Sequence, residues 1–85
     1  PIVVKDRQHR WVAVNSATCC LLDKPEPQLV GQCDRDFLPV HQVKAIWQCV
    51  EEVFTTGVAQ AIEMTLPWPQ PHPQRCILHC FVIHT

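Results

Sequence analysis

Residues 6–17 read DRQHRWVAVNSA, and LVG at 29–31, FLP at 37–39 and TTG at 55–57 follow further along the chain. These segments combine apolar runs with the polar, proline and glycine residues that form turns and helix ends. In the first segment a strand-like WVAV run leads into Asn15 and Ser16, and either residue has a side-chain oxygen suited to capping a helix. The order of the segments predicts a β-hairpin, then short helices, then one long helix that ends at Gly57.

Two short strands and three short helical segments are expected within the first 38 residues. The β-branched run at residues 2–5 and the run at 11–14 predict two strands joined by a polar turn. The first helix is expected to end at Leu22, because the prolines at 25 and 27 disfavour helical geometry in the residues before them. Single helical turns are expected at residues 28–31 and 34–38.

The longest helix is predicted from Pro39 to about Thr56. Its apolar residues recur at i, i+3, i+4 and i+7, which is the spacing of one buried helix face. Gly57 suits the left-handed conformation that commonly ends a helix. The predicted buried face consists of Val43, Ile46, Trp47, Val50 and Phe54.

Two long strands are predicted after this helix, at residues 58–66 and 75–84. The first alternates apolar and polar residues, as a half-buried strand does, and the second is apolar on both faces. The alternate prolines of residues 67–73 predict an extended connection, because proline cannot donate to a ladder. The predicted fold class is α+β, with helices packed on one face of an antiparallel sheet. In the second strand one face holds Cys76, Leu78, Cys80 and Val82, and the other holds Ile77, Phe81 and Ile83.

The chain has 85 residues, of which 47% are hydrophobic and 18% are charged, and its formal net charge is −1. This size and composition predict a single domain over residues 1–85. The near-neutral charge offers no electrostatic footprint for nucleic acid, and no apolar run is long enough to span a bilayer. Neither nucleic acid nor direct membrane contact is therefore expected. The start at Pro1, without an initiator Met, predicts a segment of a longer protein.

The six cysteines leave disulfides, metal ligands and buried thiols as alternatives. Most of them stand among apolar neighbours, where cysteine packs as a small hydrophobe. Reduced thiols and a cytoplasmic location are therefore expected. Cys76, Cys80 and His84 share one strand face, but residues four apart on a strand are separated by about 13 Å, too far for one tetrahedral ion. No metal site is predicted.

The ordered spacing of these segments resembles the PAS domain family over essentially the whole chain. The sequence departs from that family at His9, where many members have glycine, and at residues 67–73, where the two long strands usually meet in an Asp-Gly hairpin. The family also adds one more strand at the end. Here that strand is expected to lie outside this segment, to be disordered or to come from a partner, because an unpaired sheet edge would otherwise be exposed. The matching positions are Asp6, Trp11, Asn15, Ala17, Leu21, Leu29-Val30-Gly31 and Thr56-Gly57.

The resemblance implies a ligand cavity between the long helix and the sheet. Haem is not expected, because the family's axial histidine position falls at Ile46 or Trp47. Photoreactive flavin is not expected either, because Cys33 lies one position before the family's reactive cysteine and precedes an acidic residue. The alternative is that the same residues simply fill a core. The candidate cavity residues are Ile46, Trp47, Val50, Phe54, Ile62, Met64, Leu78 and Cys80.

The resemblance further implies a regulatory sensor module of a cytoplasmic, bacterial signalling protein. Its output domain would lie in the same longer chain and be a histidine kinase or a cyclic-di-GMP enzyme such as a diguanylate cyclase. The sequence holds no catalytic motif, so an enzyme is not expected. Homodimerisation is expected through the outer face of the last strand, at Ile77, Phe81 and Ile83. The different-class alternative is a thiol-based redox or metal-binding module that uses Cys19, Cys20, Cys76 and Cys80.

Overall fold

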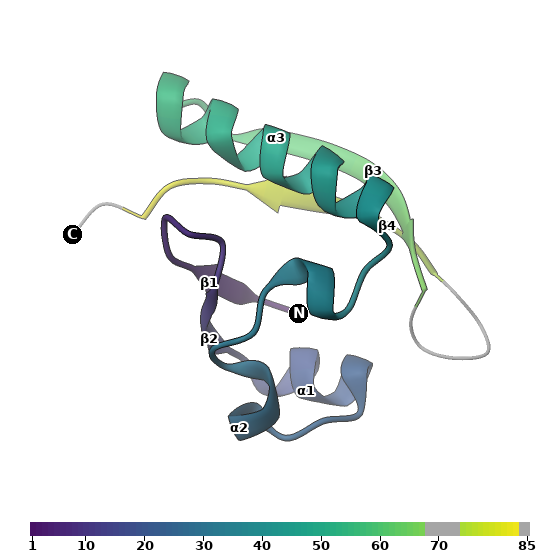
Figure 1. Ribbon diagram of the computed structural model, residues 1–85. Helices are drawn as coiled ribbons and strands as arrows, with labels where there is room; N and C mark the ends of the chain where they lie inside the picture. Colours follow the sequence, from purple (N-terminus) through teal and green to yellow (C-terminus); the bar gives the residue numbers. More distant parts are fainter. Residues whose placement is uncertain (68–73, 84–85) are drawn as a thin grey trace.

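The computed structural model describes residues 1–67 and 74–83, and it confirms the α+β class (Figure 1). Helices and strands follow one another in the predicted order. They are β1 (Val3–Lys5), β2 (Trp11–Val14), α1 (Ser16–Leu22), α2 (Glu26–Leu29), the 3-10 helix η1 (Asp34–Asp36), α3 (Val40–Thr56), β3 (Gln60–Leu66) and β4 (Gln74–Cys80).

The strands form two antiparallel hairpins, where a single sheet was expected. Val3 of β1 lies opposite Val14 of β2, and the β3–β4 ladder runs from the Gln60–Cys80 pair to the Leu66–Gln74 pair. Within the described residues each strand pairs only with its neighbour in sequence. No ladder therefore joins the two hairpins. Figure 1 shows the β3–β4 hairpin alongside α3, with β1 and β2 below them and α1 and α2 below those.

Predicted helix ends are confirmed where a capping residue fixes them. Asn15 caps α1, since its Oδ1 accepts a hydrogen bond from the Thr18 backbone N–H at 3.0 Å. Gly57 ends α3 with a φ of 72°, and its N–H donates to the Val53 carbonyl at 2.8 Å. A cap acts within one helical turn, so a short stretch of sequence is enough to identify it.

Several predicted boundaries were wrong. β3 begins at Gln60 and not at residue 58, and η1 ends at Asp36 and not at residue 38. α2 spans Glu26–Leu29 rather than 28–31, because Pro27 sits in its first turn, where the missing N–H has no intrahelical partner to lose. β4 ends at Cys80 and not at His84, because its partner Gln60 is the first residue of β3. Residues 68–73 of the predicted connection and His84 lie outside the described residues.

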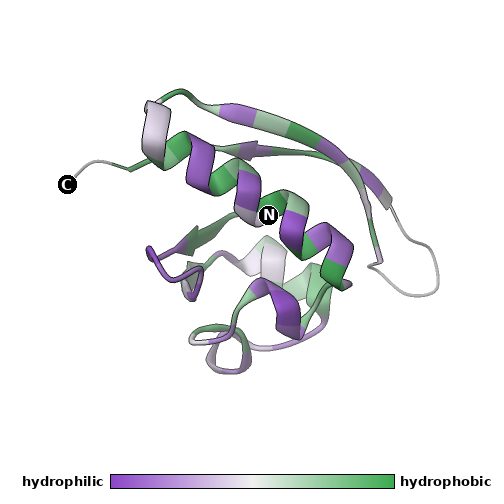
Figure 2. Ribbon diagram, turned by 45° about the horizontal axis from the view of Figure 1, so that its top comes forward, coloured by the Kyte–Doolittle hydropathy of each residue, from purple (hydrophilic) through white to green (hydrophobic). Residues whose placement is uncertain are grey.

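The core is formed by α3 together with β2, α2 and the residue that precedes η1. Figure 2 shows apolar and polar residues alternating around α3 and along β3, as expected for half-buried elements. Gln42 ties the start of this helix to β3, since its Nε2 donates to the Thr65 carbonyl at 2.6 Å. Of the predicted helix face, Trp47, Val50 and Phe54 are half-buried, whereas Val53, which was not predicted, is buried. The buried apolar residues are Trp11, Leu29, Cys33, Val43, Ile46 and Val53.

Replacing Gly57 with alanine is expected to lower the free energy of unfolding by about 1 kcal/mol. An added Cβ would meet nothing within 4 Å, so the loss is that of the left-handed backbone alone. Urea unfolding measures it. Gly57→Asn is the matched control and should lose less, because asparagine tolerates this conformation better. Equal stability of Gly57→Ala and the parent protein would contradict the cap.

Candidate functional site

The carboxylate of Asp34, at the start of η1, is buried. Only 2% of the residue is exposed. Lys5 Nζ lies 2.8 Å from its Oδ1 and forms the compensating ion pair. Trp11 Nε1 donates to Oδ1 at 3.1 Å, and Trp47 Nε1 donates to Oδ2 at 2.8 Å. One carboxylate therefore joins β1, β2, η1 and α3, and both of its oxygens are satisfied.

Sequence reasoning missed this cluster. Trp47 was predicted to line a cavity, and Asp34 was considered only as a neighbour of Cys33. The partners of Asp34 lie 29, 23 and 13 residues away in sequence, so no periodic pattern links them. The one available signal was an acidic residue between two apolar segments, LVG and FLP, in a chain that has three tryptophans, each with one indole N–H donor.

The turn between β1 and β2 docks on the side of α3. The His9 ring stacks on the Trp47 ring at a centroid distance of 4.4 Å, and His9 Nε2 lies 3.1 Å from Glu51 Oε1. The Arg7 guanidinium lies over the Phe54 ring, 4.0 Å from its centroid. This turn covers Trp47 and Phe54, which explains why these two predicted cavity residues are half-buried at the flank of the helix.

His9 has a φ of 65°, in the left-handed region that glycine adopts readily. The departure at His9 noted in the sequence therefore concerns the side chain, since the backbone keeps a glycine-like conformation. A residue with a Cβ persists in this region when its surroundings hold it. The stack on Trp47 and the contact of His9 Nε2 with the Glu51 carboxylate provide that support.

Asp6 is the first residue of the turn between β1 and β2, and its carboxylate accepts hydrogen bonds from within this turn. Its Oδ1 accepts hydrogen bonds from the backbone N–H of Gln8 at 2.9 Å and of Arg10 at 3.0 Å. Its Oδ2 lies 3.1 Å from Arg10 Nε. The hydrogen bond from the Arg10 backbone amide is the main reason why the pKa of Asp6 lies below its ordinary value. The carboxylate is thus held in its charged form at the turn.

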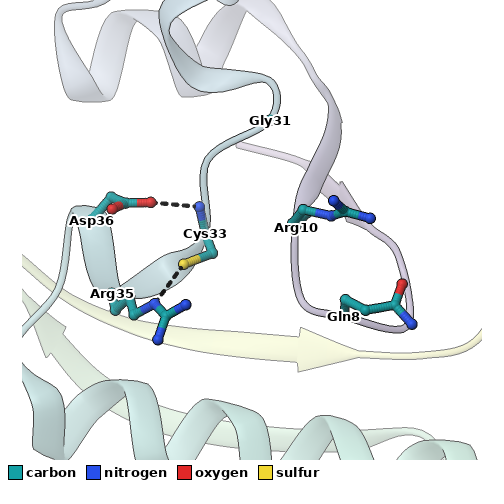
Figure 3. Close-up of a pocket in the computed structure, with 6 residues that line it drawn as sticks. All are labelled: Gln8, Arg10, Gly31, Cys33, Arg35 and Asp36. Carbon is teal, nitrogen blue, oxygen red and sulfur yellow. Dashed lines mark hydrogen bonds between the residues drawn. The ribbon is translucent and has the colours of Figure 1, made fainter.

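A shallow hollow of about 410 Å³ opens between this turn and η1 (Figure 3). Arg35 Nε donates to Cys33 Sγ at 3.3 Å, and the Cys33 backbone N–H donates to Asp36 Oδ2 at 2.8 Å. A second hollow, of about 260 Å³, lies beside Cys19 and Cys20 of α1. Neither hollow is lined by a predicted cavity residue. The lining of the larger one consists of Gln8, Arg10, Gly31, Cys33, Arg35 and Asp36.

Comparison with known proteins identifies the family to which the chain belongs. The sequence profile described as the PAS fold matches residues 1–83. The chain belongs to the PAS family. PAS domains are generally regulatory sensor modules of signalling proteins rather than catalysts, and they commonly dimerise and sit in multidomain proteins. This PAS domain is also similar to an uncharacterized protein of Sinorhizobium fredii, y4lL, with 29% identity over 77 residues.

The match with y4lL covers 91% of this chain and 9% of that protein. The chain therefore spans a small part of the length of this relative. No solved structure matches the PAS domain significantly.

The predicted cavity residues lie on the two elements that the fold brings together, α3 and the β3–β4 hairpin. On the helix Ile46 is buried and Val50 is half-buried. On the hairpin the predicted residues are half-buried and alternate with exposed ones. The helix and both strands are in contact. A ligand cavity between them stays a prediction for this PAS domain.

The predicted interface residues lie on the solvent side of β4 and just beyond it. Ile77 is 59% exposed, Phe81 is 67% exposed and Ile83 is 60% exposed. Cys76, Leu78 and Cys80 alternate with them and are half-buried. The predicted division of this segment into two faces is therefore confirmed, while its use as an interface stays a prediction.

All six cysteines of the PAS domain are free thiols. Burial, followed by the neighbouring thiol of Cys80 on β4, raises the pKa of the Cys49 thiol on α3 to about 11. Burial also raises the pKa of Cys76. Among residues 1–67 and 74–83 no group of three or more His, Cys, Asp and Glu side chains is placed to hold a metal ion. In the same residues no helix has the length and apolar character needed to cross a membrane.

Proposed function

We propose that this PAS domain is a sensor and dimerisation module within a longer, cytoplasmic signal-transduction protein. The observation that carries the proposal is the outer face of the β4 segment. Ile77, Phe81 and Ile83 are each more than half exposed, at 59%, 67% and 60%. A row of large apolar side chains on the solvent side of a domain this small is typical of a surface that another protein covers.

A second copy of the domain is the proposed occupant of this face. Two-fold symmetry brings the same patch of both copies together, so one apolar row buries the other. The PAS family supports this choice, since its members commonly dimerise. Pairing through β4 would also place the β3–β4 hairpin, which contacts α3, next to the partner.

The sensor part of the proposal concerns a small molecule held between α3 and the hairpin. The proposed lining includes Val50, Ile62 and Leu78, which are half-buried and come from three elements. A ligand that binds one arrangement of α3 and the hairpin better than another would shift the population between them. The shift would reach an output domain in the same longer chain, proposed to be a histidine kinase or a cyclic-di-GMP enzyme.

Native mass spectrometry of freshly purified protein at micromolar concentration tests both parts. The parent protein is expected to be a dimer, and Phe81→Glu is expected to weaken the dimer about 100-fold or more, because it buries a charge without a partner. Val40→Glu is the matched control, since Val40 is 69% exposed and lies on α3, away from the β4 face. Its dimer should persist.

A bound ligand would appear in the same spectra as excess mass that is lost on denaturation. A parent protein that is monomeric would contradict the dimer, and a parent protein without excess mass would contradict the sensor. Dimers of equal strength in Phe81→Glu and the parent would place the interface elsewhere.

A further inference from the structure

The hollow between the β1–β2 turn and η1 is separate from the space between α3 and the β3–β4 hairpin. Figure 3 shows Gln8 and Arg10 of the turn on one side of it, and Cys33, Arg35 and Asp36 on the other. Its volume is about 410 Å³, which is within the range of sites that hold small organic molecules. A molecule bound here would therefore be distinct from one held in the cavity predicted from the sequence.

The backbone holds the two sides of the hollow together. Arg10 and Cys33 form an antiparallel β-bridge. Beside this bridge the Trp11 N–H donates to the Gln32 carbonyl at 2.7 Å, and the Gly31 N–H donates to the Trp11 carbonyl at 2.8 Å. These bonds fix the end of the turn against the residues that lead into η1. The hollow is thus bounded by paired backbone and does not depend on side chains alone.

Two arginines of the lining are each anchored through one nitrogen. Arg10 Nε donates to Asp6 Oδ2 at 3.1 Å, and Arg35 Nε donates to Cys33 Sγ at 3.3 Å. The Arg35 guanidinium also lies over the Trp47 ring, 5.9 Å from its centroid. In the part of the chain that the structure describes, the Nη groups of both arginines have no hydrogen-bond acceptor. The two guanidiniums are therefore held in place while their outer N–H donors stay available.

The charges around the hollow favour a ligand with a single negative charge. Asp6 and Asp36 offset the two arginines, so the site has no excess of positive charge for a phosphate dianion. A carboxylate suits it better, because the planar guanidinium group binds a carboxylate through two directed hydrogen bonds. Gln8 adds an amide that both donates and accepts, which suits a polar group elsewhere on the same molecule.

We propose that this hollow is a second ligand site, in which Arg10 and Arg35 bind the carboxylate of a small organic monoanion. The bound carboxylate bridges the β1–β2 turn and η1. η1 also holds Asp34, which accepts a hydrogen bond from Trp47 of α3, so the ligand restrains elements that the buried carboxylate already joins. Binding to the folded state alone stabilises the domain. The site is independent of dimerisation and of a ligand between α3 and the hairpin.

The test is an NMR titration of the ¹⁵N-labelled protein with acetate at neutral pH, in which acetate replaces chloride at constant ionic strength. The expected result is a saturable shift of the Nε–H signals of Arg10 and Arg35, with a dissociation constant on the order of 1 mM. Arg10→Gln and Arg35→Gln are each expected to weaken binding about 10-fold. Lys44→Gln is the matched control, since Lys44 is exposed on α3 and does not line the hollow. It should bind acetate as the parent does.

Asp36→Asn keeps the test decisive even where an arginine variant folds poorly. It removes the carboxylate that repels the ligand, while its amide oxygen is able to keep the bond from the Cys33 backbone N–H. Acetate is expected to bind this variant about 3-fold more tightly than the parent. Shifts that do not saturate would overturn the proposal, as would equal affinities in the arginine variants and the parent or an unchanged affinity in Asp36→Asn. Tighter binding of inorganic phosphate than of acetate to the parent would overturn the assignment of a carboxylate.

Discussion

Asp34→Asn is expected to lower the free energy of unfolding by about 3 kcal/mol or more. Asparagine has nearly the same shape but replaces one acceptor oxygen with an NH2 donor. In either orientation that donor faces an indole N–H, because Trp11 donates to one oxygen and Trp47 to the other. The substitution also leaves the charge of Lys5, whose side chain is 19% exposed, without its partner. A domain of this size has a stability of roughly 5–10 kcal/mol, so much of it would be lost.

Urea unfolding followed by tryptophan fluorescence measures this loss as a lower midpoint. Asp36→Asn is the matched control, two positions further along η1. Asp36 is exposed and accepts a single backbone hydrogen bond, from Cys33 at 2.8 Å. The amide oxygen of asparagine is able to keep that bond, so a loss below about 1 kcal/mol is expected. Similar losses in the two variants would show that the buried carboxylate does not hold the elements together.

Leu29→Ala is expected to cost about 2–5 kcal/mol. Leu29 is 0% exposed, which makes it one of the most completely buried side chains of the domain. It ends α2, and this helix packs on both β2 and α1. The short helix has little internal hydrogen bonding of its own, so it is held mainly by this side chain. Truncation leaves a cavity that the surrounding structure fills only in part.

Far-UV circular dichroism during urea unfolding measures the effect of Leu29→Ala. Val30→Ala is the matched control on the next residue, because Val30 is 37% exposed. It should lose less than about 1 kcal/mol. Equal losses at the two positions would mean that the α2 segment is anchored by its backbone and not by the buried leucine.

Features that depend on neighbouring residues were predictable from the sequence. The cap at Asn15, the glycine end of α3 and the alternation along β3 and β4 are confirmed, because each arises within one helical turn or one strand. α2 was placed two residues late, since Pro27 acts as a helix breaker in the interior of a helix and is tolerated in its first turn. The PAS family was also predictable, because its characteristic segments are themselves turns and helix ends.

The candidate site was predictable only in part. Ile46 and Val50 lie on the face of α3 that was expected, but the chemical partners of Trp47 were not foreseen. Trp47 donates to Asp34 and stacks on His9, so two of its surfaces are occupied by segments from earlier in the chain. Periodicity identifies which side of a helix is apolar, but it does not identify what covers the edge of that side.

The local order of strands, turns and helix ends in this PAS domain follows from interactions between residues a few positions apart, and the sequence therefore contains it. The ion pair of Lys5 with Asp34 and the hydrogen bond from Trp47 to Asp34 depend on how β1, η1 and α3 pack against one another, although these elements are remote in sequence. Packing of this kind is a collective result of burying apolar area and leaves no spacing that can be read along the chain. Folding is thus what turns an acidic residue into the link between four elements of the domain.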